Sequence, residues 1–471
     1  MSPKNKKGTG AWRARTAVVF LVVAVLCVQL WSVLVTAPGG DSVEAAERAE
    51  EKRDVVVVEE RKKAVSGKEK TVAYAISVTK DGSYMDGAAV LAHSAIRVHR
   101  GSLSAYGVAL VAFVAPAVTS LEQLRVCGYR VLRRDLPLEV ADIKGERLRQ
   151  GIKSNGCCGA WELLKLYAWT LTEYHRVVHV DMDVAILQNL DELFQDDSDL
   201  WWRQEEEGKS VVAKDGSESS SSLPPEKKKK KKKKAIYALY TWDWTMARGK
   251  NKPVQGGFLV AKPSMEIYEA LVDVVREGDF RSGSGWGGTG AGTYWGGMTI
   301  QGLLPYFFET VRPGRGRDLD ECVYNNMANN PRDVGGFDKG RCRRDATLHP
   351  KPCKDCRLVS VDTIKTVHFT ICQKPWGCVS ASRQSCPYCP ICAKLHAMWF
   401  DIRKEMETEW GTYNTLDYAG TARERHGMCG KSGYKPVPIH KLMKNHSLAQ
   451  KWRDSWHASA SIEEIGTTTR R

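Results

Sequence analysis

The sequence lacks several features that would point directly to a function. It has no internal repeat, which excludes a solenoid or a propeller built from repeated units. It has no zinc-finger, RNA-binding or helix-turn-helix signature, although its net charge is +15. Eight of these charges form one uninterrupted run, Lys227–Lys234, and without that run the net charge is +7. We interpret the run as part of a disordered low-complexity insert, residues 203–234, and expect no nucleic-acid partner.

Charged residues are also missing from one N-terminal segment, Ala17–Val35, which is nearly continuously apolar. At ~1.5 Å per residue it is long enough to span a bilayer. Basic residues precede it and acidic residues follow it, so the positive-inside rule places the N-terminus in the cytosol. A cleaved signal peptide is the alternative, but its apolar region is usually only ~7–15 residues long, and no small-x-small site stands near Ala37. We therefore expect a cytosolic tail (1–15), a transmembrane signal anchor (16–37) and a stem (38–70) before a lumenal domain.

Cysteines are concentrated in one part of the chain, because eight of the 14 lie between Cys342 and Cys392. The spacings Cys353-x-x-Cys356 and Cys386-x-x-Cys389-x-x-Cys392 are typical of zinc sites in cytosolic proteins. In an oxidising lumen, disulfides are the expected state. We favour a disulfide-linked elaboration over residues 342–392, with a zinc-binding interaction module as the alternative.

Strands and helices are expected to alternate over residues 71–400. Runs rich in β-branched and other apolar residues predict strands at Thr71–Thr79, Val108–Val114, Tyr129–Leu132, Val177–Val180 and Gly257–Ala261. Helical spacing of apolar residues is found at Ala88–Val98, Leu121–Cys127 and Trp161–Leu171. This alternation predicts a mainly parallel, doubly wound α/β sheet. The tail, 401–471, gives mixed amphipathic signals and no recognisable chemistry.

One Gly-dense segment, Ser282–Gly297, contains Trp286, Tyr294 and Trp295. Its composition is typical of a mobile loop with aromatic contact surfaces, as carbohydrate sites often need. A merely irregular loop is the alternative on composition alone.

Two carboxylates, Asp181 and Asp183, directly follow the strand Val177–Val180, with only Met182 between them. In open α/β sheets, ligands bind outside the carboxyl ends of the strands. Paired carboxylates there are suited to a hard divalent cation, which would in turn neutralise a diphosphate. A bare Asp-x-Asp is most often a turn or a cap, and the buried-type strand before it favours a functional site.

Five segments occur in an informative order along the chain. They are Leu163–Phe194, Val254–Ser264, Gln301-Gly302-Leu303-Leu304, Tyr324-Asn325, and His368-Phe369 followed by Lys374-Pro375-Trp376. Together they resemble glycosyltransferase family 8, a retaining family that includes glycogenin and the plant xylan glucuronosyltransferases. Lys374 follows His368 by six residues, as in the family pattern. The resemblance covers about Thr71 to Trp376 apart from the insert, and it implies a Rossmann-like nucleotide-sugar transferase domain of the GT-A type.

The resemblance implies a role for each matching residue. Asp181, Asp183 and His368 would hold Mn²⁺, which two carboxylates and an imidazole suit better than Mg²⁺. Lys374 would contact the diphosphate and stabilise the leaving group, and Gln301 would stabilise the positively charged transition state. The remaining donor-binding residues would be Thr79 and Tyr84 at the base, Lys165 before the metal strand, and Gln255, Gly256 and Gly257 beside the sugar.

The implied function is a Mn²⁺-dependent retaining glycosyltransferase that moves a sugar from a UDP-sugar to a glycan or glycoprotein acceptor. Its expected location is the Golgi membrane, as a single-pass type II protein with a lumenal catalytic domain. No Asp or Glu stands out as a base or nucleophile, which favours front-face attack with the departing phosphate oxygen taking the acceptor proton. Ile300 stands where the family has an Asp that contacts sugar hydroxyls, and Gln255-Gly256-Gly257 replaces Asn-Ser-Gly. The alternative is therefore a catalytically inactive nucleotide-sugar-binding homologue that acts as a scaffold or lectin-like module.

Overall fold

The computed structural model describes residues 70–100, 103–196, 234–247, 253–334, 337–343, 353–378, 390–414, 429–430, 433–445, 447, 449–450 and 452. The predicted cytosolic tail and signal anchor, and nearly all of the predicted stem and insert, lie outside these residues. Within the described part of the chain, no helix is long and apolar enough to cross a bilayer.

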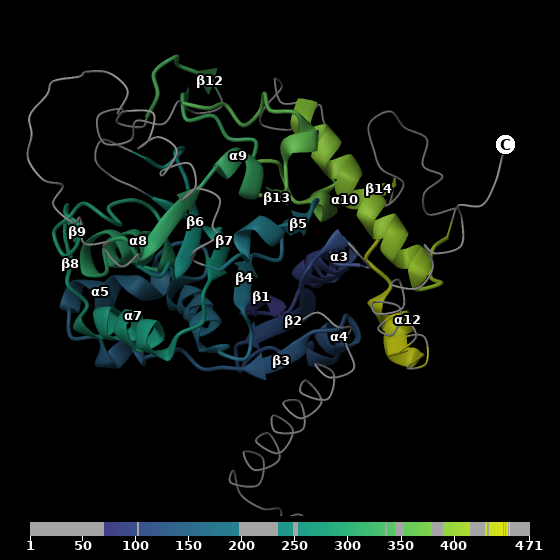
Figure 1. Ribbon diagram of the computed structural model, residues 1–471, viewed down its shortest axis with the longest axis horizontal. Helices are drawn as coiled ribbons and strands as arrows, with labels where there is room; N and C mark the ends of the chain where they lie inside the picture. The colour runs from purple at the N-terminus through teal and green to yellow at the C-terminus, as the bar shows by residue number, and fades with distance from the viewer. Residues whose placement is uncertain are drawn as a thin grey trace, which may run out of the picture. The chain divides into compact units, whose positions relative to one another are not determined.

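A seven-stranded sheet has the order β10-β6-β7-β4-β1-β2-β3 (Figure 1). Its strands are β1 (Thr71–Val78), β2 (Gly107–Val114), β3 (Arg130–Arg133), β4 (Arg176–Val180), β6 (Ala238–Trp242), β7 (Val254–Ala261) and β10 (Gly316–Leu319). β1 is parallel to β2 and β4, β2 to β3, and β6 to β10, whereas β7 is antiparallel to both β4 and β6. The predicted mainly parallel α/β sheet is thereby confirmed, and each of the five predicted strands lies in it.

Four antiparallel pairs of short strands lie outside the large sheet. They are β5 (Val184–Ile186) with β13 (Thr366–His368), β8 (Phe280–Arg281) with β9 (Gly285–Trp286), β11 (Asp333–Val334) with β12 (Phe337–Asp338), and β14 (Cys429–Gly430) with β15 (Gly433–Tyr434).

The large sheet is buried on both faces because successive strand residues point to opposite sides and both sets are apolar. Val72, Tyr74 and Ile76 of β1 face one core, which also contains α3 (Tyr84–Arg97), α4 (Leu121–Val126), α10 (Pro390–Glu409) and α12 (Ile439–Lys444). Ala73 and Ala75 face the second core, which contains α5 (Glu146–Gly151), the 3₁₀ helix η4 (Gly159–Thr170), α7 (Met265–Glu277) and α8 (Ile300–Tyr306). The described unit therefore has three layers, with helices on both sides of one sheet.

The predicted helices at Ala88–Val98 and Leu121–Cys127 are confirmed as α3 and α4, but Trp161–Leu171 is corrected from an α-type spacing to the 3₁₀ helix η4. Apolar residues are buried all around η4, so their positions do not select a 3.6-residue period. In a 3₁₀ helix, side chains three residues apart eclipse one another. Glu162 and Lys165 consequently lie one above the other, and their charged groups are 2.8 Å apart.

The ends of α7 show how the Pro-Ser segment after β7 turns the chain. Ser264 is extended and its hydroxyl accepts a hydrogen bond from the Ile267 backbone N–H at 3.4 Å. Gly278 ends the helix with φ +65°, a conformation that favours glycine. The helix between them packs its apolar side, including Leu271, against η4.

α10 extends from Pro390 to Glu409, so the predicted boundary between residues 400 and 401 falls inside one helix. Its Leu395 and Trp399 are buried in the core that contains α3, and Figure 1 shows α10 lying beside α3. Farther along the helix, Arg403 and Glu407 form a buried ion pair of 2.7 Å.

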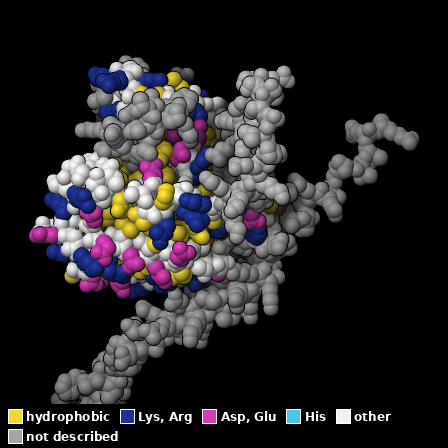
Figure 2. Space-filling view, turned by 60° about the vertical axis from the view of Figure 1, so that its left-hand side comes forward, with side chains coloured by type: hydrophobic (Ala, Val, Ile, Leu, Met, Phe, Trp, Pro, Cys, Tyr) yellow, Lys and Arg dark blue, Asp and Glu magenta, His cyan; other side chains and the backbone are white. Residues whose placement is uncertain are grey.

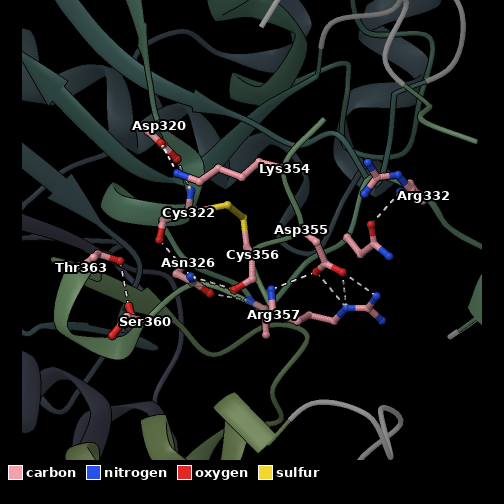
Figure 3. The surroundings of a disulfide bond; sticks show 12 residues. Asp320, Cys322, Asn326, Arg332, Lys354, Asp355, Cys356, Arg357, Ser360 and Thr363 are labelled. Atoms are coloured by element: carbon pink, nitrogen blue, oxygen red, sulfur yellow. Dashed lines mark hydrogen bonds and ion pairs between the residues drawn. A yellow bond between two sulfur atoms is a disulfide. The ribbon is translucent and has the colours of Figure 1, made fainter. Parts of the chain in front are cut away.

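Three disulfides are formed among the described cysteines, linking Cys322 to Cys356, Cys342 to Cys353, and Cys372 to Cys392. The two cysteines of Cys353-x-x-Cys356 thus pair with different partners, which confirms the expected disulfides there and leaves no CxxC zinc pair at that position. Cys386 and Cys389 lie outside the described residues. Figure 3 shows Asn326 beside the first disulfide, where its amide donates to the carbonyl oxygens of Cys322 (2.9 Å) and Cys356 (3.3 Å).

Candidate active site

Asp181 and Asp183 lie just beyond the C-terminal end of β4. The Asp181 backbone N–H donates to the Gly257 carbonyl of β7 at 3.2 Å, and the Asp183 carbonyl accepts from Phe369 at 2.9 Å. β5 follows directly and pairs with β13, so that Val184 lies opposite His368. This strand pairing brings the histidine to the two carboxylates from a distant part of the chain.

The three predicted metal ligands form a compact cluster. One ligand atom from each of Asp181, Asp183 and His368 lies within 4.8 Å of the other two. His368 Nε2 is 3.3 Å from Asp183 Oδ1 and 3.9 Å from Asp181 Oδ2. Two carboxylates and one imidazole nitrogen this close together form a donor set that fits a divalent cation such as Mn²⁺.

The two carboxylates have different surroundings. Asp183 is buried, with 7% of its side chain exposed; burial raises its pKa, but His368 and Lys374 outweigh this effect and hold the pKa well below its ordinary value. Asp181 is 35% exposed at the mouth of the cluster, and desolvation by the surrounding protein raises its pKa although the Lys165 ammonium opposes this. A bound cation would favour the ionised form of Asp181.

Two lysines flank the cluster. Lys374 Nζ is 2.6 Å from Asp183 Oδ2 and donates to the Phe369 carbonyl at 2.7 Å. Lys165 Nζ is 2.8 Å from Asp181 Oδ1 and donates to the Gly256 carbonyl at 3.0 Å. Lys165 is only 3% exposed. Burial lowers its pKa, but the carboxylates of Asp181 and Glu162 raise the pKa well above its ordinary value, so Lys165 is a buried ammonium ion.

Gly256 and Gly257 lie in an irregular part of β7. The pairing of β6 with β7 passes from Tyr240–Leu259 directly to Thr241–Gln255, so the intervening residues bulge from the ladder toward the cluster. A Cβ on Gly257 would collide with the His368 ring and lie 2.6 Å from its Nδ1. On Gly256 it would lie 3.4 Å from Lys165 Nζ, a contact that needs at most a small shift. The Gln255 side chain folds back to accept the Gly257 N–H at 2.5 Å.

Gln301 and Ile300 begin α8 and lie against Gly256, beside Lys165. A Cβ on Gly256 would lie 3.5 Å from Gln301 Cγ and 3.9 Å from Ile300 Cγ2. Gln301 is therefore close to Lys165 and Gly256, and its side chain is half-buried. Ile300 is fully buried in the second core, where a carboxylate would be desolvated.

Thr79 and Tyr84 lie on the β1 side of the cluster, at the end of that strand and at the start of α3. Both side chains are half-buried. The Tyr84 ring packs edge-on against Trp376, with 5.3 Å between ring centroids. Burial, followed by the charge of Asp183, raises the pKa of Tyr84 to about 12. Tyr84 therefore borders the cluster of Asp181, Asp183 and His368, and its hydroxyl stays protonated at neutral pH.

Three further residues around the cluster were not predicted from the sequence. Glu162 holds Lys165 in place through an ion pair. Its position three residues before Lys165 on a helix is the feature of the sequence from which this ion pair could have been predicted. His179 is fully buried in β4, with Nε2 2.9 Å from the Ser77 hydroxyl. Asp243 is buried directly after β6, and it accepts a hydrogen bond from the Thr245 N–H at 3.1 Å. No spacing rule in the sequence connects β6 to the Asp-x-Asp segment.

A separate groove of ≈ 380 Å³ is lined by α7, Trp286, Tyr306 and Arg312, and it contains none of the predicted site residues. Figure 2 brings this side of the molecule forward and shows hydrophobic side chains exposed among scattered Lys, Arg, Asp and Glu side chains. Because positive and negative side chains are mixed on this face, neither sign of charge dominates it.

No protein-family model matches the chain. Human glycogenin-2 is 32% identical over 119 residues, which are 25% of this chain and 22% of that protein. Glucose N-acetyltransferase 1 of Aspergillus fumigatus is 50% identical over 46 residues, 9% of this chain and 12% of that protein. The chain thus spans less than a quarter of the length of either relative. Among solved structures, the glycosyltransferase GlyE of Streptococcus pneumoniae TIGR4 is 12% identical, with a TM-score of 0.36 over 79% of this chain and 66% of that one. The similarity to glycogenin-2 supports, over part of the chain, the predicted resemblance to glycosyltransferases.

Proposed function

We propose that this chain is a Mn²⁺-dependent retaining glycosyltransferase of the family 8 type, with a UDP-sugar as donor and a glycan or glycoprotein as acceptor. The observation that carries the proposal is the convergence of Asp181, Asp183 and His368 within 4.8 Å at the carboxyl end of β4. Two lysine ammonium groups border this cluster, and diphosphate binding at such a place needs concentrated positive charge.

In this proposal Asp181, Asp183 and His368 hold the metal ion, which when bound neutralises charge on the diphosphate. Lys374 donates to a diphosphate oxygen and stabilises the negative charge that develops on the leaving group. Lys165 orients Asp181 and fixes the Gly256 carbonyl, so the bulge of β7 holds its place beside the donor. Thr79 and Tyr84 line the nucleotide base.

Transfer requires that the bond from the anomeric carbon to the phosphate oxygen breaks while a bond to the acceptor hydroxyl forms. Attack from the same face retains the configuration, and the departing phosphate oxygen takes the acceptor proton, so no protein base is required. Gln301, whose side chain lies against Gly256 and Gly296, would stabilise the positive charge on the sugar ring through its amide oxygen. This role places it beside the transferred sugar, together with Gly256 and Gly257.

The proposed location is the Golgi membrane, in the single-pass type II orientation. The three disulfides support an oxidising compartment for the described domain. The apolar segment Ala17–Val35 and its flanking charges support the orientation.

A second candidate function is a nucleotide-sugar-binding homologue without turnover. The buried Ile300 favours it, because this position supplies a carboxylate to the donor sugar in the family pattern. Both candidate functions predict UDP binding, but only the first predicts transfer of the sugar.

The test is UDP release by the purified full chain from a panel of UDP-sugars, with Mn²⁺ or with EDTA. We expect Mn²⁺-dependent release from one donor, reduced at least 100-fold by Asp183→Ala. Asp273→Ala, which removes an exposed carboxylate of α7, is the matched control and should keep wild-type rates. Mn²⁺-dependent UDP binding without release from any donor, in the presence of added acceptor glycans, would support the inactive homologue. Absence of UDP binding would contradict both candidates.

A further inference from the structure

The Gly-rich segment predicted to carry aromatic contact surfaces uses its three aromatic residues in different ways. Trp286 is fully buried, and its indole N–H donates to the Gly297 carbonyl at 2.9 Å. The Tyr294 hydroxyl donates to the Gln301 carbonyl at 2.8 Å. Trp295, in contrast, is 59% exposed. Two of the aromatic side chains therefore fix the segment, and the third is presented to solvent.

The position of Trp295 is set by contacts of its neighbour, Gly296. Gly296 has φ +80°, and a Cβ there would collide with the Gln301 side-chain amide and lie 3.2 Å from its Cδ. On its other side, the Gly296 Cα lies 3.2 Å from where a Cβ on Gly156 would stand. Met298 adds a hydrogen bond from its N–H to Asn155 Oδ1 at 2.9 Å. The backbone next to Trp295 is thus held between Gln301 and the turn at residues 155–156.

These contacts link the cluster to Trp295 step by step. The metal cluster adjoins Gly257, Gly256 follows with Lys165 and Gln301 against it, and Gln301 touches Gly296. Trp295 directly precedes Gly296 in the chain and is exposed. In the proposed reaction the transferred sugar lies at Gly256 and Gln301, so an acceptor that binds on the Gly296 side of Gln301 would meet Trp295.

The chemistry of an exposed indole indicates what it binds. A single exposed apolar side chain is common on protein surfaces, and Met265 and Leu358 are examples here. A protein interface needs on the order of 800 Å² from each partner, which one exposed ring does not supply. A pyranose needs only one aromatic face, because its axial C–H groups form an apolar patch while its hydroxyls remain in water.

We propose that Trp295 is a stacking platform for a sugar ring of the acceptor, at the rim of the site beyond Gln301. This inference rests on the proposed glycosyltransferase function and adds to it that the acceptor is a glycan recognised through a ring face. The indole binds the acceptor and takes no part in bond making.

The test is binding of oligosaccharides to the full chain loaded with Mn²⁺ and UDP, measured by saturation-transfer NMR and titration. The probes are maltotetraose, cellotetraose, xylotetraose and lactose. We expect at least one of them to bind the wild type, and Trp295→Ala to weaken its Kd about tenfold, which corresponds to ~1.4 kcal/mol of lost stacking. Trp295→Phe keeps an aromatic face and should stay within about threefold of the wild type. Met265→Ala, at an exposed position on α7, is the matched control.

UDP affinity, measured on the same samples, distinguishes a failure of the Trp295 platform from a failure of the proposed function. Unchanged UDP binding with loss of oligosaccharide binding in Trp295→Ala alone supports the platform. Oligosaccharide binding by Trp295→Ala equal to that of the wild type would overturn it. So would a wild type that binds UDP and none of the four probes. Failure of the wild type to bind UDP would overturn the proposed function, and this inference with it.

Discussion

At Gly257 the chain has no room for a side chain. Gly257→Ala should displace the His368 ring, which a Cβ would meet at 2.6 Å from Nδ1, and weaken Mn²⁺ binding at least tenfold. Gly256→Ala is the matched change one residue earlier, where the nearest atom is 3.4 Å away at the end of the Lys165 side chain. Isothermal titration with Mn²⁺ should show a clear difference between the two variants. Equal affinities would mean that His368 is not a ligand.

Lys165 is the residue whose loss should destabilise the site most. Lys165→Met leaves the carboxylates of Glu162 and Asp181 without their common partner, at a cost of about 3 kcal/mol for a buried pair of this kind. Adding Glu162→Gln removes one unpaired charge and should recover about 1 kcal/mol. Urea unfolding of both single variants and the double variant measures this coupling. If the effects of the two substitutions on the free energy of unfolding were additive, the buried ammonium of Lys165 would be contradicted.

The sequence allowed only part of the site to be predicted. Asp181 and Asp183 follow directly from their place after a buried strand. His368 and Lys374 could be assigned only through the family resemblance, because β13 reaches β5 by a long-range pairing of three residues in each strand. Glu162 was not predicted, because a charged residue on a helix is usually solvated.

At the scale of elements, the disulfide Cys322–Cys356 holds the segment that presents His368. Asn326 bonds both half-cystine carbonyls, and its own carbonyl accepts the His368 N–H at 3.0 Å. Replacing both cysteines by serine should lower the free energy of unfolding by about 2–4 kcal/mol and also weaken Mn²⁺ binding.

The disulfide Cys342–Cys353 provides the control for that change. It closes a sequence separation of 11 residues instead of 34, so its removal should cost about 1 kcal/mol less. Mn²⁺ affinity should stay at the wild-type value, because no hydrogen bond links this disulfide to His368 among those described. A loss of Mn²⁺ affinity in both double variants would show that the effect is general destabilisation.

The strands that were predicted correctly are those whose own sequences are rich in apolar residues. β1, β2 and β4 are buried on both faces, and most of their residues are apolar. α10 was not predicted, because buried charges such as Arg403 and Glu407 interrupt its apolar side. This helix packs on α3, which is far away in the sequence. Such a long-range contact leaves no pattern in the local sequence from which the helix could be predicted.

At the scale of the whole molecule, residues beyond 400 belong to the folded unit. Met406, Trp410, Leu442 and Trp452 are buried in the core that contains α3. Each contributes about 1.5–3 kcal/mol by burial, so their joint loss approaches the whole stability of a typical domain. A chain ending at Phe400 should lack a cooperative thermal transition, whereas one ending at Trp452 should keep it. A folded, cooperative shorter chain would show that α10 and α12 are accessory.

The central claim is that Asp181, Asp183 and His368 form one metal centre. The most direct measurement is Mn²⁺ binding to the full chain in the presence of UDP, followed by electron paramagnetic resonance and by titration. We predict one Mn²⁺ per chain, with affinity reduced at least 100-fold in Asp183→Ala and unchanged in Asp273→Ala. Binding of equal strength and stoichiometry in Asp183→Ala would contradict the metal centre and the function built on it.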